Sequence, residues 1–188
     1  MDIFTLLLAC GPAVHPNTTT ALIVAESGGN PYAIGDNTDK RSYFPKTKDE
    51  AVALSTRLLQ SGHRIDMGLT QISSPWLTAW GVSLDQVFDS CSNIRLGTFL
   101  LADNYQRCAV AGRGEKAALW CALSTYNTGT ASGGYAYVNR VLDAANVYSE
   151  LRYIQPRQSA KQHTKVHHTV DYGGLLFPSA APASVTFK

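Results

Sequence analysis

The carboxyl group of Glu26 occupies a place in the sequence where its proton should be hard to remove. The apolar run 21–25 before it is typical of the last turns of a buried helix, and Gly28, Gly29 and Pro31 should end that helix. Glu26 then lies at the negative end of the helix dipole and against apolar surface, and both surroundings raise the pKa of a carboxyl. A glutamic acid that stays protonated near neutral pH is what general acid catalysis needs.

Many helices end in a solvated glutamate followed by glycine, so a purely structural role is the alternative for Glu26. Two further segments bear on this choice. One is 66–72, Asp-Met-Gly-Leu-Thr-Gln-Ile, and the other is 124–129, Ser-Thr-Tyr-Asn-Thr-Gly. With 26–31 before them, they resemble in order and spacing the catalytic core of lytic transglycosylases related to goose-type lysozyme. The patterns of that family are Glu-Ser-x-x-(Asn/Asp)-Pro, Gly-Leu-(Met/Thr/Gly)-Gln-Ile and (Ala/Ser)-x-Tyr-Asn-x-Gly.

The residues between these motifs narrow the resemblance to the VirB-type branch, which accompanies type IV secretion and conjugation systems. They are the segments 30–35, 62–66 and 88–94, and the resemblance covers about residues 10–148. It implies a lysozyme-like fold and peptidoglycan glycan strands as the substrate. It also implies components of a type IV secretion or conjugation machine as partners, and a periplasmic location.

The resemblance gives Glu26 two successive roles. As an acid it would protonate the oxygen of the β-1,4 bond between N-acetylmuramic acid and N-acetylglucosamine. As a base it would then take the proton of the muramic acid 6-hydroxyl while that oxygen closes onto the anomeric carbon. The product is a 1,6-anhydro sugar, and no water is consumed. A retaining glycosidase normally needs a second carboxylate about 5 Å away, and here the N-acetyl group of the substrate is thought to replace it.

The resemblance also implies which side chains hold the substrate. Gln71 would donate and accept hydrogen bonds to the sugar, and Gly68 would let the backbone approach the glycan closely. Tyr126 would reach the catalytic carboxyl with its hydroxyl and hold its rotamer, although core packing is the alternative for a tyrosine. Asn127 would bind an N-acetyl group, and Ser27 would orient the carboxyl or contact that group.

Asp66 complicates the mechanism because it is a second acid directly before the Gly-Leu-Thr-Gln-Ile segment. A goose-type hydrolase would use such an acid to position water, whereas capping of a loop is its structural alternative. Trp76 and Trp80 could stack on sugars, but their helical spacing first indicates packing in the core or the cleft wall.

Hydrophobic spacing predicts a mainly helical chain with one small hairpin around the turn 37–40. Asn17 or Thr18 should cap the second helix and Asn93 a later one, while 65–74 reads as loop or short strand. Helices are expected at 3–10, 17–26, 48–61, 75–80, 93–111, 115–125 and 137–148, and strands at 32–36 and 42–46.

Length and charge fit one globular domain that does not bind nucleic acid. The chain has 188 residues and a net charge of +2, and its apolar start, 1–10, is too short to span a bilayer and lacks a basic n-region. The lysozyme-like domain is expected at 1–153, and 154–188 is expected to be a basic, disordered or extended tail. The tail's three histidines, His163, His167 and His168, are read as incidental; no metal and no cofactor are expected.

The four cysteines have no CxxC spacing and no histidine at ligand spacing, which disfavours a metal site. Two disulfides in an oxidising compartment fit better than buried free thiols, and three connectivities are open. Cys108 and Cys121 flank a turn and could pair, which would leave Cys10 for Cys91. The family resemblance supports the pairing of Cys10 with Cys91.

The sequence therefore predicts a mainly α (α+β) lysozyme-like fold, with a small β-hairpin beside the substrate cleft, that acts as a lytic transglycosylase. A hydrolytic muramidase acting on the same bond is the alternative within the enzyme class. A non-catalytic glycan-binding assembly factor is the alternative outside it.

Overall fold

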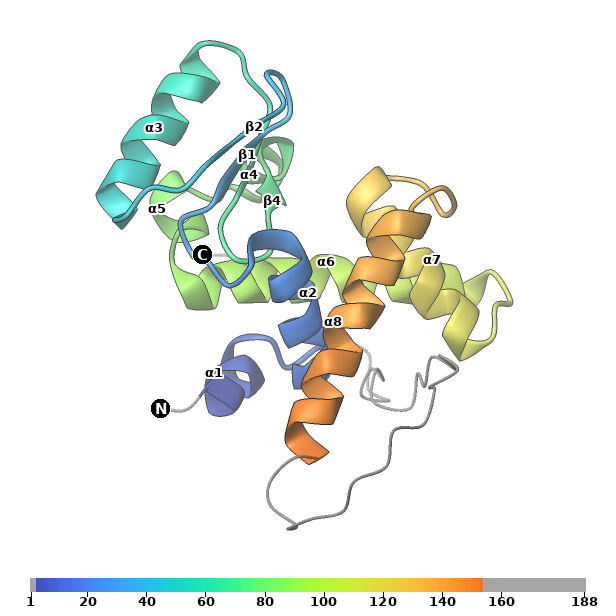
Figure 1. The fold of residues 1–188 in the computed structure, drawn as a ribbon. Helices are drawn as coiled ribbons and strands as arrows, with labels where there is room; N and C mark the ends of the chain where they lie inside the picture. Colours follow the sequence, from blue (N-terminus) through green and yellow to red (C-terminus); the bar gives the residue numbers. More distant parts are fainter. Residues whose placement is uncertain (1–2, 154–188) are drawn as a thin grey trace.

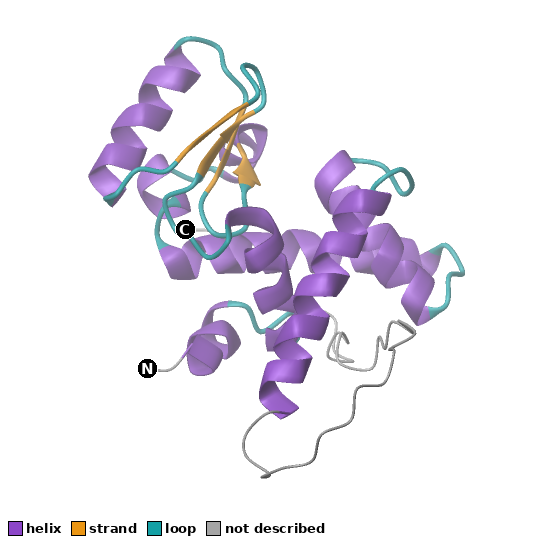
Figure 2. Ribbon diagram, in the orientation of Figure 1, coloured by secondary structure: helices purple, strands orange, loops and turns teal. Residues whose placement is uncertain are grey.

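Two lobes share one long central helix, α6 (Ser90–Val110), in the computed structural model (Figure 1). The structure describes residues 3–153, with side chains described from 4 to 146. The expected tail and its histidines lie outside the described residues. Helices dominate, and the strands gather in one place (Figure 2), so the expected mainly α class with a small sheet is confirmed.

The α lobe consists of α6 and the helices α1, α2, α7 and α8. Helix α2 packs mainly on α8, and α7 packs mainly on α6. Its core is made of aliphatic side chains from α2, α6, α7 and α8 together with the ring of Tyr137. The further helices of this lobe are α1 (Ile3–Cys10), α2 (Pro16–Ser27), α7 (Glu115–Thr128) and α8 (Tyr135–Tyr153).

The β lobe is a four-stranded antiparallel sheet in the order β2-β1-β3-β4, with helices around it. Its buried side chains form a second core, to which α6 contributes Leu96. The strands are β1 (Ile34–Asp36), β2 (Arg41–Tyr43), β3 (Ile65–Met67) and β4 (Ile72–Ser73), and the helices are α3 (Lys48–Gln60), α4 (Ser74–Trp80) and α5 (Leu84–Val87).

The expected elements are present with shifted ends, and three details of the sequence reading were wrong. His15, not Asn17 or Thr18, caps α2, because its Nδ1 accepts the backbone N–H of Asn17. The long helix begins earlier than expected, with Asp89 as its cap. Helix α5 was not expected at all. Of the two alternatives for 65–74, the structure contains strands, which extend the hairpin into the sheet.

Asn93 was expected to cap a helix, but its side chain is fully buried and connects α6 to the β lobe by hydrogen bonds. Its Nδ2 donates to the carbonyl oxygens of Met67 (3.0 Å) and Val87 (2.8 Å). Its Oδ1 accepts the N–H of Thr70 at 2.8 Å and lies 2.7 Å from the Thr70 hydroxyl. The donors and the acceptor of this amide are therefore all engaged, and they fasten the turn 68–71, the end of β3 and the end of α5 to α6.

Two disulfides close the α lobe, as the cysteine count indicates. Cys10 pairs with Cys91 and joins α1 to the start of α6, while Cys108 pairs with Cys121 and joins the end of α6 to α7. No helix within residues 3–153 combines the length and the apolar character that crossing a bilayer requires.

Replacing Asn93 by Ala should lower the free energy of unfolding by about 3 kcal/mol or more, because buried partners on three residues lose their hydrogen bonds. Urea denaturation measures this loss. The exposed helical amide of Gln60 provides the control, since Gln60→Ala should stay within about 0.5 kcal/mol of the wild type. Similar small losses in both variants would contradict the role given to Asn93.

Candidate active site

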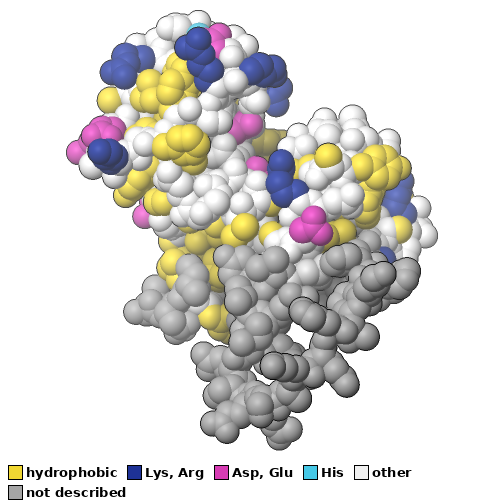
Figure 3. Space-filling model, viewed as in Figure 1, with side chains coloured by type: hydrophobic (Ala, Val, Ile, Leu, Met, Phe, Trp, Pro, Cys, Tyr) yellow, Lys and Arg dark blue, Asp and Glu magenta, His cyan; other side chains and the backbone are white. Residues whose placement is uncertain are grey.

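Glu26 lies in the last turn of α2, as the sequence predicts. Gly28 follows with a left-handed backbone (φ 62°), and its N–H donates to the carbonyl oxygen of Val24 and ends the helix. The side chain is partly buried and lines a cleft of about 850 Å³ between the two lobes. In Figure 3 the surface is hollowed between the β lobe and the α7–α8 end, with charges of both signs at its edges.

Tyr137 is the residue whose side chain holds the Glu26 carboxyl, and the sequence did not predict this role. Its hydroxyl donates to Oε1 of Glu26 at 2.5 Å, and its ring is almost completely buried in the core of the α lobe. Tyr137 lies in the first turn of α8, and Glu26 lies at the end of α2. The contact therefore depends on the packing of two helices far apart in the sequence. No motif marks Tyr137; only a tyrosine at the start of a predicted helix could have suggested it.

Burial raises the pKa of Glu26 from an ordinary value of 4.5 to about 7. The hydrogen bond from Tyr137 lowers this pKa, the negative charge of Asp66 raises it, and the positive charge of Arg140 lowers it. Burial and the neighbouring Glu26 charge raise the pKa of both Tyr137 and Tyr126 well above the usual range. Both tyrosines therefore remain neutral hydroxyl donors. Near neutral pH the protonated and the ionised form of Glu26 are both populated.

Tyr126 does not hold Glu26, contrary to the sequence prediction. Its hydroxyl donates to the carbonyl oxygen of Thr70 at 2.7 Å, so it fixes the turn 68–71 to α7. Ser27 acts on the same turn, because its hydroxyl donates to the carbonyl oxygen of Leu69 at 2.8 Å. That Ser27 orients the Glu26 carboxyl stays a prediction. Its contact with substrate, like that of Tyr126, remains a prediction.

Gln71 lines the cleft, but part of its predicted chemistry is not available. Its Nε2 donates to the carbonyl oxygens of Gly68 (2.8 Å) and Ala33 (3.1 Å), which uses both N–H bonds of the amide. Only Oε1 is left to accept from a sugar. Packing alone requires a glycine at position 68, because a Cβ there would lie 2.3 Å from Nδ2 of Asn93.

Asp66 lies on β3 and lines the cleft together with Asn127, which is exposed as a substrate contact should be. Its Oδ2 accepts the amide of Asn37 at 2.7 Å. Its Oδ1 is buried without a hydrogen-bond partner in the described part of the chain. Trp76 also lines the cleft and stacks on Trp80 with 4.6 Å between ring centroids, which matches packing in the cleft wall.

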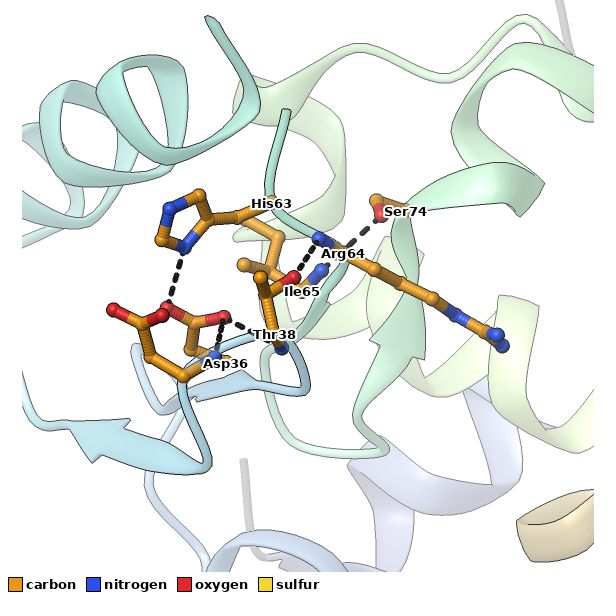
Figure 4. A network of polar contacts seen from close by, with 7 residues as sticks. Asp36, Thr38, His63, Arg64, Ile65 and Ser74 are labelled. Carbon is orange, nitrogen blue, oxygen red and sulfur yellow. Dashed lines mark hydrogen bonds and ion pairs between the residues drawn. The ribbon is translucent and has the colours of Figure 1, made fainter. Parts of the chain in front are cut away.

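Three potential metal ligands, Asp36, Asp39 and His63, lie together in the β lobe (Figure 4). Asp36 is almost fully buried, and its oxygens are engaged. Oδ1 accepts the N–H groups of Thr38 and Asp39, and Oδ2 lies 2.8 Å from Nδ1 of His63. These contacts give the three residues a structural role, because they stabilise the hairpin turn that follows Asp36.

A helical lobe and a small antiparallel sheet that face each other across a cleft, with one protonatable glutamate at a helix end, define the lysozyme-like class. Within that class the chain belongs to the transglycosylase SLT domain family, whose model matches residues 8–139.

Among curated proteins, the chain is similar to bacterial proteins named virB1. It is 34% identical over 155 residues to a "Type IV secretion system protein virB1" of Brucella abortus biovar 1, covering 78% of this chain and 65% of that protein. It is 32% identical to "Protein virB1" of Agrobacterium fabrum, covering 72% of this chain and 56% of that protein.

A "Putative peptidoglycan-binding-like protein" of Escherichia coli K12 is 28% identical, over 63% of this chain and 62% of that protein. The alignment with the Brucella protein covers less than two thirds of that protein's length. No solved structure matches the chain significantly.

Replacing Tyr137 by Phe should raise the pKa of Glu26 above about 7, because the variant lacks the hydroxyl that stabilises the carboxylate. An NMR titration that follows the Cδ of Glu26 measures this pKa, with Glu26→Gln to assign the signal. Tyr126→Phe is the matched control. It removes a hydroxyl that bonds to Thr70, so the pKa of Glu26 should not move. Equal shifts in both variants would count against the assignment.

Proposed function

We propose that the chain is a peptidoglycan lytic transglycosylase that cleaves the β-1,4 bond between N-acetylmuramic acid and N-acetylglucosamine. The observation that carries the proposal is Glu26, a carboxyl with a pKa of about 7 that faces a cleft and accepts a hydrogen bond from Tyr137. An acid that gives up a proton and takes one back in the same turnover needs a pKa near the working pH. Membership of the transglycosylase SLT domain family supports the same reaction.

In the first step, the proton of Glu26 passes to the glycosidic oxygen while the bond from that oxygen to the anomeric carbon breaks. The carbonyl oxygen of the substrate's N-acetyl group bonds to the anomeric carbon and replaces the nucleophilic carboxylate of other retaining enzymes. In the second step, the 6-hydroxyl oxygen attacks the anomeric carbon and displaces the N-acetyl oxygen. The Glu26 carboxylate takes the hydroxyl proton, so the acid is restored and a 1,6-anhydro product leaves.

Tyr137 suits both steps because a neutral hydroxyl can donate to either form of the carboxyl group. Burial disfavours the carboxylate, and the Tyr137 bond and the Arg140 charge partly offset this. Tyr137 and Arg140 thus keep the ionised form accessible for the second step. Gln71 Oε1 and the exposed Asn127 are the groups in the cleft that we assign to the sugar.

The hydrolytic muramidase remains the second candidate because Asp66 lies in the same cleft as Glu26. To act as a base on water, Asp66 would need an oxygen that water can reach. Its Oδ1 is shielded from solvent, so only Oδ2, which already accepts the Asn37 amide, is left to take a proton from water. We therefore assign Asp66 an electrostatic role, in which its charge raises the pKa of Glu26.

The setting we propose is the periplasm, where the enzyme opens the wall locally for a type IV secretion or conjugation machine. The names of the Brucella and Agrobacterium relatives support this setting. The two disulfides suit an oxidising compartment. A purely structural glycan-binding factor would have no need for the raised pKa of Glu26.

Glu26→Gln should lower kcat/KM on purified peptidoglycan by about 10² to 10⁴, because the amide accepts the Tyr137 hydrogen bond but has no proton to transfer. Mass spectrometry of the released sugars should find 1,6-anhydro ends with the wild type and almost none with the variant. Glu115→Gln, an exposed carboxyl outside the cleft, serves as the control and should keep wild-type activity. Full activity of Glu26→Gln would overturn the proposal, and binding without any product from the wild type would favour the structural factor.

Asp66→Asn should move the alkaline limb of the pH–rate profile to lower pH, because the pKa of Glu26 falls when the neighbouring charge is gone. The acid form is needed, so activity decreases as pH rises through this pKa. The products should still carry 1,6-anhydro ends. Asp49→Asn, on the exposed start of α3, should leave the profile unchanged. Reducing-end products from the wild type that disappear in Asp66→Asn would establish the hydrolase instead.

A further inference from the structure

Two non-glycine residues of the described chain have a positive φ, Lys40 (57°) and Gln71 (50°), and both line the cleft. A side chain in this left-handed region costs free energy that glycine would not cost. Such strain persists where the surrounding structure enforces it, and it is concentrated at sites of function. Gln71 belongs to a family motif, which accounts for it. Lys40 belongs to none, so its presence in a turn that favours glycine needs another reason.

The turn that carries Lys40 is fixed to the backbone of Arg64. The N–H of Asn37 donates to the carbonyl oxygen of Arg64 at 2.9 Å, and the N–H of Arg64 donates to the hydroxyl of Thr38 at 3.0 Å. The buried Asp36, paired with His63, braces the same turn (Figure 4). The position of Lys40 relative to Arg64 is therefore set by a hydrogen-bonded framework and not by two independent loops.

Arg64 directs its charge away from this framework. In Figure 4 its side chain extends away from the Asp36–His63 pair, and its Nε donates to the hydroxyl of Ser73 at 3.3 Å. Arg64 and Lys40 both line the cleft. We call these two residues the cationic lip.

Neither charge of the cationic lip is part of an ion pair among the side chains of residues 4–146. The ion pairs there are Lys48–Asp85, His63–Asp36 and Arg107–Asp103, and none of them includes Lys40 or Arg64. Asp66, which also lines the cleft, accepts the amide of Asn37 rather than a cation. Two positive charges on hydrogen-bonded neighbouring segments thus line the cleft without a carboxylate partner among the described side chains.

We propose that the cationic lip binds a carboxylate carried by the muramic acid residues of the glycan strand. The inference rests on the proposed function and names its substrate more closely. The sugar rings and N-acetyl groups of the strand are uncharged, so its negative charge lies on the lactyl side chain or on the peptide attached to it. The negative charge of Asp66 repels a carboxylate from the centre of the cleft, while the lip attracts it. The enzyme is therefore specific for strands that carry carboxylates.

The test uses Lys40→Gly, Arg64→Gln and the double variant. Lys40→Gly relieves the positive φ, so its thermal unfolding midpoint should equal or exceed that of the wild type while activity falls. The value of kcat/KM on intact peptidoglycan should fall about two- to fivefold for each single variant, the range of one exposed ion pair. On peptidoglycan whose carboxyl groups have been converted to methylamides, the variants should match the wild type. Added salt should weaken the wild type more than the double variant.

Matched controls remove the same charges elsewhere, with Lys46→Ala and Arg57→Ala, which are exposed and outside the cleft. Strands stripped of peptides by an amidase separate the two sources of the carboxylate. The amidase frees the lactyl carboxylate, which is an amide wherever a peptide is attached. A loss on stripped strands shows that the lip binds the free lactyl group, and a loss confined to peptide-bearing strands assigns the peptide. Equal losses on charged and methylamidated material, or equal losses in the controls, would overturn the proposal. Anhydro products from the wild type and none from Glu26→Gln would show that the proposed function stands independently of that outcome.

Discussion

The turn 68–71 is held by three helices, and the shape of the cleft depends on it. Ser27 of α2 bonds to the carbonyl oxygen of Leu69, and Tyr126 of α7 bonds to that of Thr70. Asn93 of α6 fixes the same turn through hydrogen bonds to the N–H of Thr70 and the carbonyl oxygen of Met67. The turn joins β3 to β4, so these bonds set the position of the sheet relative to the helical lobe. They also set the place of Gln71 in the cleft that Glu26 lines, because a strained φ of 50° survives only where neighbours enforce it.

The proton of Glu26 is governed by opposing effects on its pKa. Burial and the charge of Asp66 favour the neutral acid, while the hydroxyl of Tyr137 and the charge of Arg140 favour the carboxylate. Arg140 also lies over the ring of Tyr137, with its Cζ 5.4 Å from the centroid. The donor that holds Glu26 is therefore itself placed beneath a cation. Tyr137 and Arg140 belong to α8 and Asp66 belongs to β3, so the pKa depends on the packing of both lobes.

The sequence predicted those features of the site that depend on local signals. An apolar run followed by two glycines places Glu26 at a helix end, and the Gly-Leu-Thr-Gln-Ile segment places Gln71 in a turn. It failed where function depends on contacts between distant elements. Tyr137 acts through the packing of α2 on α8, and periodicity does not predict which helices become neighbours. Asn93 has the side chain of a cap, but its burial between lobes gives it a different task.

Gly68 illustrates how a correct motif can carry a wrong reason. The family resemblance marks the position, and a glycine without Cβ suggests close approach by substrate. The structure instead fills the space beside its Cα with the amide of Asn93, 2.3 Å from where a Cβ would lie. The glycine is needed so that Asn93 can reach the turn. In this chain the hydrogen bonds and the packing of Gly68, Ser27 and Tyr126 position the turn 68–71. Under the proposed function, Glu26 is then the motif residue whose chemistry requires direct contact with the reacting bond.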